Sequence, residues 1–115
     1  MERNKISIVS CSGASNTGKY TDEVARRMAA KDLATMLCLA KISISDQTLI
    51  KKIKDGSGKI IVLDGCPFNC AEKILAKEGI TNVIHLNTTD FEIKKGVTLV
   101  SDEKVDEIID HIKRL

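Results

Sequence analysis

A short aliphatic run, KIIVLD at residues 59–64, constrains the fold of this chain more than any other segment. Its four central residues are all apolar, and three of them are β-branched, which favours an extended strand. Because no polar residue alternates with them, both faces of the strand are expected to be buried. Strands of this kind occur in parallel sheets that helices cover on both sides, so the run predicts an α/β fold.

Segments with strand and helix periodicity alternate along the rest of the chain. Further strands are expected at residues 4–11, in the first part of 33–42 and at 82–86, with a short edge strand at 97–100. Amphipathic helices are expected after Ser15 or Thr17 as far as Lys31, after Ser45, from Pro67 to Gly79 and after Ser101. The alternation predicts a three-layer α/β fold, Rossmann-like or flavodoxin-like, with about four mainly parallel strands and helices on both faces. A length of 115 residues suits a single metal-binding domain over residues 1–115, with the metal site argued below.

Composition argues against several classes of partner. The formal net charge is +2 with both signs interleaved, and aromatic residues make up 3% of the chain. Nucleic-acid binding through a basic stripe or through base stacking is therefore not expected. The N-terminal residues carry neither a secretory signal nor an apolar run that could cross a bilayer. We therefore expect a cytoplasmic protein without a membrane partner.

Four cysteines are present, and thiols stay reduced in the cytoplasm, so metal or redox chemistry is expected rather than a disulfide framework. Cys11 follows the first expected strand, Cys38 ends the second, and Cys66 follows the third. Cys70 lies in the first turn of the next helix. Any one of them alone would be interpreted as a small buried apolar residue. Together they fall at the carboxyl edge of the sheet, where α/β proteins bind ligands, which indicates one shared site.

Four thiolates form the ligand set of structural Zn²⁺ or of an iron–sulfur cluster. Zinc is favoured because Cys11 and Cys38 come singly from distant segments, whereas cluster proteins usually draw most ligands from one cysteine-rich run. We therefore expect one Zn²⁺, structural or sensing. The C-x-x-x-C spacing of Cys66 and Cys70 departs from the C-x-x-C of zinc ribbons, and another thiophilic ion stays an alternative. A closed tetrahedral site offers no open position for catalysis.

Seven residues beside the cysteines are candidates for surrounding the metal or for binding an anion next to it. Backbone N–H groups and Lys19 would offset the negative charge of the thiolates, and Asp64 would accept hydrogen bonds from loop N–H groups. The seven are Ser12, Gly13, Thr17, Gly18, Lys19, Asp64 and Gly65. His85 lies within an expected buried strand and is interpreted as a core histidine rather than a ligand.

Two other functions are compatible with the same residues. Cys66 and Cys70 at a helix start could carry thiol or persulfide chemistry, as a redox protein or a sulfur carrier.

Gly13–Lys19 lies within one residue of the phosphate-binding pattern G-x-x-x-x-G-K-[ST], but Tyr20 replaces the hydroxyl residue that would hold Mg²⁺. A nucleotide or anion binder is therefore the weaker alternative. No catalytic residue is indicated, and the partner is left open between a protein and a small thiol or other soft ligand.

The stretches Asp64-Gly65-Cys66-Pro67-x-x-Cys70, Cys11-Ser12-Gly13 and Cys38-Leu39-Ala40 together resemble the DGC-domain family, named for its Asp-Gly-Cys motif. The resemblance extends over nearly the whole chain. It implies zinc binding with Cys11, Cys38, Cys66 and Cys70 as the ligands. It implies no particular reaction.

Overall fold

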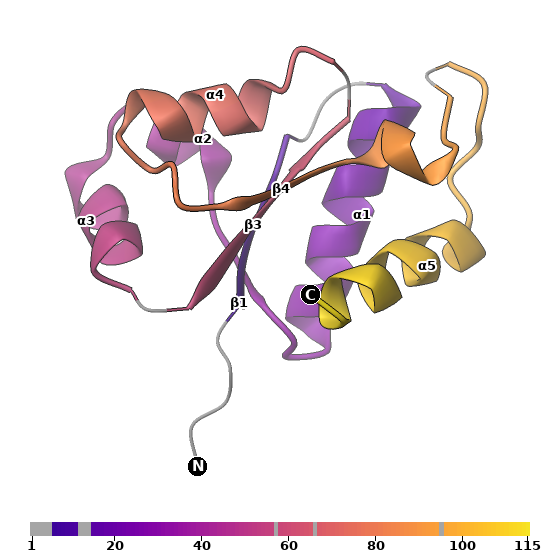
Figure 1. Ribbon diagram of the computed structural model, residues 1–115, viewed down its shortest axis with the longest axis horizontal. Coiled ribbons are helices and arrows are strands. Elements are labelled where there is room, and N and C mark those ends of the chain that lie inside the picture. The colour runs from indigo at the N-terminus through magenta and orange to yellow at the C-terminus, as the bar shows by residue number, and fades with distance from the viewer. Residues whose placement is uncertain (1–5, 12–14, 57, 66, 95) are drawn as a thin grey trace.

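The computed structural model of the chain describes residues 6–11, 15–56, 58–65, 67–94 and 96–115. Within these ranges, four parallel strands form one sheet in the order β2-β1-β3-β4 (Figure 1). The strands are β1 (Ile6–Ser10), β2 (Thr35–Met36), β3 (Lys59–Asp64) and β4 (Ile84–Asn87). The predicted parallel α/β sheet is thus confirmed.

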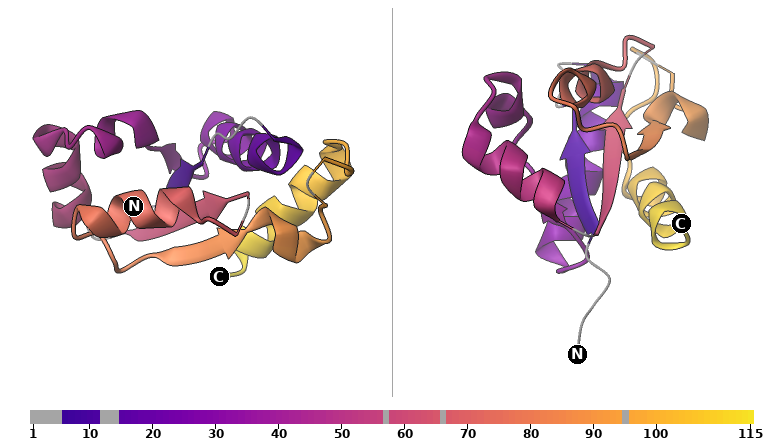
Figure 2. Two further views of the ribbon diagram at one scale, coloured as in Figure 1. Left: turned by 90° about the horizontal axis from the view of Figure 1, so that it is seen from above. Right: turned by 60° about the vertical axis from the view of Figure 1, so that its left-hand side comes forward.

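Helices cover both faces of this sheet, which confirms the predicted three layers. The helices are α1 (Asn16–Ala30), α2 (Leu39–Ser43), α3 (Gln47–Asp55), α4 (Cys70–Lys77) and α5 (Asp102–Lys113), and a 3₁₀ turn, η1 (Thr88–Phe91), follows β4. Figures 1 and 2 show α1 and α5 on one face and α2, α3 and α4 on the other. None of the helices in the described ranges is long and apolar enough to cross a membrane.

The aliphatic run in β3 is buried as its composition predicted. Its side chains alternate between the two faces, so Ile61 and Leu63 join the core beneath α1 and α5. Val62 joins the second core, beneath α3 and α4. Each core excludes water from one face of the same strand, which is why the central positions Ile61, Val62 and Leu63 are apolar.

The strand order creates a switch point between β1 and β3. From β1 the chain passes to β2 on one side, and then crosses back to β3 on the other side. The connections that leave the carboxyl ends of β1 and β3 therefore diverge, and the crevice between them is the usual ligand site of an open α/β sheet. Cys11 and Gly65 lie directly after these two strand ends.

Two expected strands differ from the structure. Residues 33–42 contain only the two-residue strand β2 before α2 begins, because Ala, Leu and Met provide little β-propensity and this strand pairs on one side alone. The expected edge strand at residues 97–100 is absent from its described positions, which form a turn and an irregular segment.

Two helix starts were also predicted wrongly. Asp46, not Ser45, caps α3 by accepting a hydrogen bond from the Leu49 N–H at 3.1 Å, while Ser45 adopts a positive φ of 62°. Helix α4 begins at Cys70 rather than at Pro67, because Asn69 before it takes the left-handed conformation with φ of 51°. The turn that precedes α4 is therefore longer than expected, and it brings Cys70 to the first position of the helix.

Candidate metal centre

Three of the four cysteines lie in described positions, and each marks the end or start of an element. Cys11 follows β1, Cys38 is the N-cap residue of α2, and Cys70 is the first residue of α4. Their thiols are free, with Cys11 half-buried and the other two exposed. Cys66 lies outside the described residues. Helices α2 and α4 pack against each other, so the two helices that begin at a cysteine are neighbours.

Cys11 lies on the same face of the sheet as these two helices. It packs against the core that contains Val9, two positions earlier, and Ala71 of α4. Its Sγ lies 3.5 Å from the Thr21 Oγ1. However, no three His, Cys, Asp or Glu side chains among the described residues form a group that could hold a metal. The complete four-cysteine set, which includes Cys66, therefore stays a prediction.

Asp64, the last residue of β3, has a buried side chain with several hydrogen-bond partners. Its side chain is 1% exposed, and its two oxygens accept hydrogen bonds from the Ala71 N–H at 2.8 Å and the Glu72 N–H at 3.1 Å. These donors belong to the first turn of α4, whereas the sequence suggested loop N–H groups. A carboxylate at a helix N-terminus interacts favourably with the helix dipole and satisfies N–H groups that have no partner within the helix.

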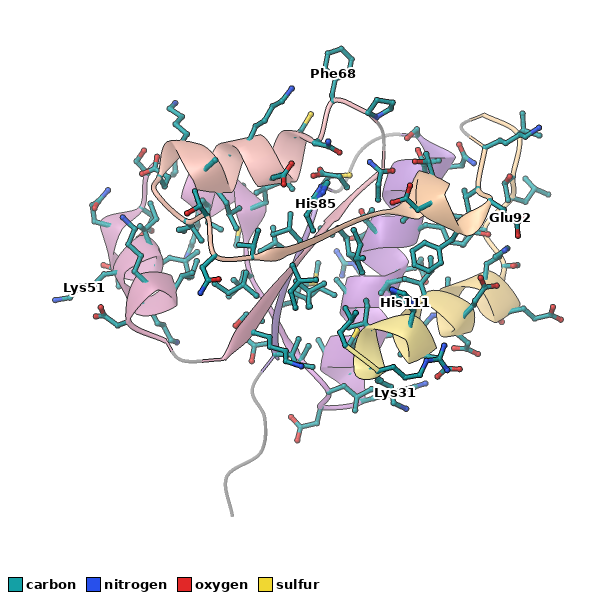
Figure 3. All side chains as sticks on the ribbon, in the orientation of Figure 1. Lys31, Lys51, Phe68, His85, Glu92 and His111 are labelled. Carbon is teal, nitrogen blue, oxygen red and sulfur yellow. The ribbon has the colours of Figure 1, made fainter. Side chains whose placement is uncertain are left out.

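His85 is a further partner of the Asp64 side chain, and the sequence did not predict this contact. Its Nε2 lies 2.8 Å from the Asp64 Oδ2, and its Nδ1 lies 3.7 Å from the Glu72 Oε2. The side chain is 21% exposed, so it is not the core histidine that the strand pattern suggested. Strand register would have located it, because His85 pairs with Val62 and so points to the same face as Asp64. Figure 3 shows it between the sheet and α4.

Gly65 is required by packing. A Cβ at this position would lie 2.7 Å from the Gly18 backbone nitrogen and 2.8 Å from the Thr17 carbonyl oxygen, both in the first turn of α1. That distance is shorter than any ordinary van der Waals contact, so only glycine lets the chain leave β3 this close to α1. Thr88 strengthens the same junction, because its hydroxyl donates to the Thr17 carbonyl at 3.0 Å.

The residues predicted to bind an anion are partly occupied by other partners. The Gly18 N–H donates to the Ser15 Oγ at 3.2 Å, and the Thr17 Oγ1 lies 2.9 Å from the same atom. Ser15 thereby caps α1. Lys19 is exposed at the same end of the helix. Ser12 and Gly13 lie outside the described residues, so the Gly13–Lys19 loop is described only from Ser15 onward.

Tyr20 occupies the position at which a phosphate-binding loop would place its Mg²⁺ ligand, and it is fully buried. Its hydroxyl donates to the Leu99 carbonyl at 2.6 Å and accepts from the Ser101 N–H at 3.0 Å. The next hydroxyl, on Thr21, is also buried and donates to the Gly18 carbonyl at 2.6 Å. Both hydroxyls are therefore occupied by hydrogen bonds to backbone groups, which weighs against a magnesium–nucleotide site in this loop.

A pair of asparagines holds the turn before Cys70. The Asn87 Nδ2 donates to the Asn69 Oδ1 at 3.0 Å, and the Asn87 Oδ1 accepts from the backbone N–H of Thr89 at 3.0 Å. Asn69 is the residue with positive φ at the start of α4. The end of β4 thus fixes the residue that directly precedes Cys70 at the start of α4. No sequence motif marked this pair.

The fold and these contacts define a class: a small parallel α/β protein with free cysteines at the carboxyl end of its sheet. The chain belongs to the DGC domain family, whose model matches residues 7–112. It is also 31% identical over 88 residues to the anaerobic and virulence modulator AnvM of Pseudomonas aeruginosa. That match covers 76% of this chain and 66% of the relative. No solved structure matches the chain.

Proposed function

We propose that this chain is a cytoplasmic zinc-binding protein that holds one Zn²⁺ with the thiolates of Cys11, Cys38, Cys66 and Cys70. The observation that supports it best is the position of the described cysteines. Two open the neighbouring helices α2 and α4, and the third follows the strand beside the switch point. Soft thiolates from three chain segments match the preference of zinc for sulfur ligands.

The chemistry of the donors fits the metal, although the thiols of Cys38 and Cys70 are exposed. When bound, zinc would cross-link the three segments and contribute its binding free energy to folding. The residues of the chain would hold the ligands in place. Asp64 fixes the first turn of α4, and Asn87 fixes the turn before it.

The N-terminus of α4 would not be the main group that offsets the negative charge of the zinc-bound thiolates. The N–H groups of Ala71 and Glu72 already donate to Asp64, so they are not available to thiolates. Four thiolates on Zn²⁺ carry a net charge of about −2. Among the described residues, the exposed Lys19 at the start of α1 is one remaining source of positive charge.

A sensing or structural role suits a closed site with four protein ligands better than hydrolysis does, because no coordination position is left for water. The Pseudomonas relative is named a modulator, which is compatible with sensing, and we propose a sensing role for this chain as well.

Elemental analysis of protein purified without added metal tests the proposal. We expect about one equivalent of zinc for each chain. Replacing Cys70 with Ser should reduce bound zinc sharply, whereas replacing Ser43, an exposed residue at the end of α2, with Ala should leave it unchanged. Zinc near zero in the wild-type protein, with all four thiols freely titratable, would contradict the proposal.

The exposed thiol of Cys70 at the first position of α4 supports a second candidate function, thiol or persulfide chemistry with Cys66 as its partner. Mass spectrometry after brief treatment with a polysulfide donor separates the two functions. Sulfur added to Cys66 or Cys70 in protein that still contains its metal would favour the second.

A further inference from the structure

The loop between η1 and α5 is held rigidly although it exposes apolar side chains. The Asn16 side chain donates to the Lys94 carbonyl at 2.9 Å and to the Thr98 carbonyl at 2.6 Å, and accepts from the Gly96 N–H at 2.5 Å. Tyr20 adds the two hydrogen bonds described above, to Leu99 and Ser101. Two side chains from the first turns of α1 thus fix this loop at five backbone positions.

Among its described residues, this loop presents two large apolar side chains to solvent: Val97, 72% exposed, and Leu99, 85% exposed. Phe68, also 72% exposed, lies on the turn before α4 and points away from the molecule in Figure 3. Both loops project from the carboxyl end of the sheet, on either side of the start of α1 (Figures 1 and 2). We call Phe68, Val97 and Leu99 the apolar tips.

Exposed lysines accompany the apolar tips. Lys94 lies on the loop itself, Lys19 on the first turns of α1, and the Lys73 Nζ lies 5.8 Å from the centre of the Phe68 ring. None of the three forms an ion pair within the described residues. The acidic residue of the loop, Glu92, lies at its η1 end, where it approaches Lys104.

From these contacts we infer that the apolar tips and their lysines form a docking surface for a protein segment that carries apolar side chains flanked by carboxylates. Rigid presentation reduces the conformational entropy that is lost on binding. Large apolar side chains held at fixed positions are typical of the residues that dominate protein interfaces. The exposed lysines would meet acidic side chains and discriminate against basic ones.

Two other occupants fit less well. In a twofold dimer the same patch faces itself, so the lysines would oppose lysines. An anionic membrane would also attract the lysines, but a fluid bilayer does not require the fixed spacing that Asn16 and Tyr20 impose.

Selection from a random peptide library displayed on phage tests the inference. The wild-type protein serves as the bait, and protein with Leu99→Ser serves for counter-selection. We expect enriched peptides to combine apolar residues with Asp or Glu. Synthetic versions should bind the wild-type protein about ten-fold more tightly than Leu99→Ser or Lys94→Glu protein.

The matched control is Ile44→Ser, because Ile44 is 76% exposed but follows α2, away from the two loops. This variant should bind the selected peptides as the wild-type protein does. Failure to select any peptide that distinguishes wild-type from Leu99→Ser protein would overturn the inference, as would enriched peptides without net negative charge.

Two further measurements test whether a membrane or a second copy of the chain occupies the surface instead. Leu99-dependent sedimentation of the protein with phosphatidylserine vesicles at physiological salt would favour a membrane, and Leu99-dependent dimers in analytical ultracentrifugation would favour a second copy. Either result would overturn the inference. The zinc content is measured on the same samples, so a failure of the docking surface is distinguishable from a failure of the metal site.

Discussion

At the scale of single residues, the motif Asp64-Gly65-Cys66 combines one buried acceptor, one packing glycine and one thiol. Asp64 receives the first N–H groups of α4, and Gly65 allows close contact with α1. Both requirements follow from contacts of the described residues and would hold without a metal. The motif therefore stabilises the fold at the same place where it supplies a cysteine.

Replacing Gly65 with Ala should lower the free energy of unfolding by about 1–3 kcal/mol, because the new Cβ would overlap backbone atoms of Gly18 and Thr17. Urea denaturation measures this change. The matched control is Gly56→Ala, where a Cβ would lie 3.4 Å or more from its neighbours and φ is −74°. Equal stability of the two variants would contradict the packing role of Gly65.

Replacing Asp64 with Asn should also destabilise the protein, by about 1–3 kcal/mol, because the amide NH₂ would face an N–H group of Ala71 or Glu72. Asp46→Asn is the control, since Asn caps a helix as well as Asp does and Asp46 accepts a single N–H of α3. Circular dichroism in urea compares the two. A larger loss for Asp46→Asn would be incompatible with this role of Asp64.

At the scale of elements, the sequence predicted the position of an element well where neighbouring elements bury its side chains. It predicted the position less well where local contacts determine the residue at which the element begins. β3 was located correctly because its continuous β-branched run is typical of a strand buried on both faces, and α5 because its apolar residues repeat with the period of a helix. The start of α4 was misplaced because Asn69 takes a positive φ that Asn87, from another strand, stabilises. His85 was misinterpreted for a similar reason, since its partner Asp64 lies on the adjacent strand.

The loop between η1 and α5 depends on α1 for its conformation. Replacing Tyr20 with Phe should keep the buried ring but remove the hydrogen bonds to Leu99 and Ser101. We expect a loss of about 1–3 kcal/mol in stability and faster hydrogen exchange at the Ser101 amide. Exchange at the Ala25 amide, within α1, serves as the internal reference. Unchanged exchange at Ser101 would show that Tyr20 does not anchor the loop.

At the scale of the whole molecule, the strand order makes neighbours of strands and helices that are distant in the sequence. Cys11 and Cys38 are 27 positions apart, yet they follow adjacent strands, and α2 packs on the helix that Cys70 opens. The sequence predicted that the cysteines share one edge of the sheet. It did not predict that Asp64 uses the N–H groups of α4, because that depends on where the helix begins.

Removing the metal should lower the melting temperature without unfolding the protein, because two aliphatic cores support the sheet independently of the cysteines. A loss of 1 kcal/mol corresponds to a decrease of about 4 °C or more in a domain of this size. Differential scanning calorimetry before and after dialysis against a chelator measures it. Identical melting curves would argue against a metal that contributes to stability.

Native mass spectrometry of protein purified without added metal tests whether four thiolates of this chain bind one metal ion. After alkylation under native conditions, we expect one zinc ion on each chain and no modified cysteine, and four alkylated cysteines once a chelator has removed the zinc. A metal-free mass, with all four thiols alkylated from the start, would contradict it.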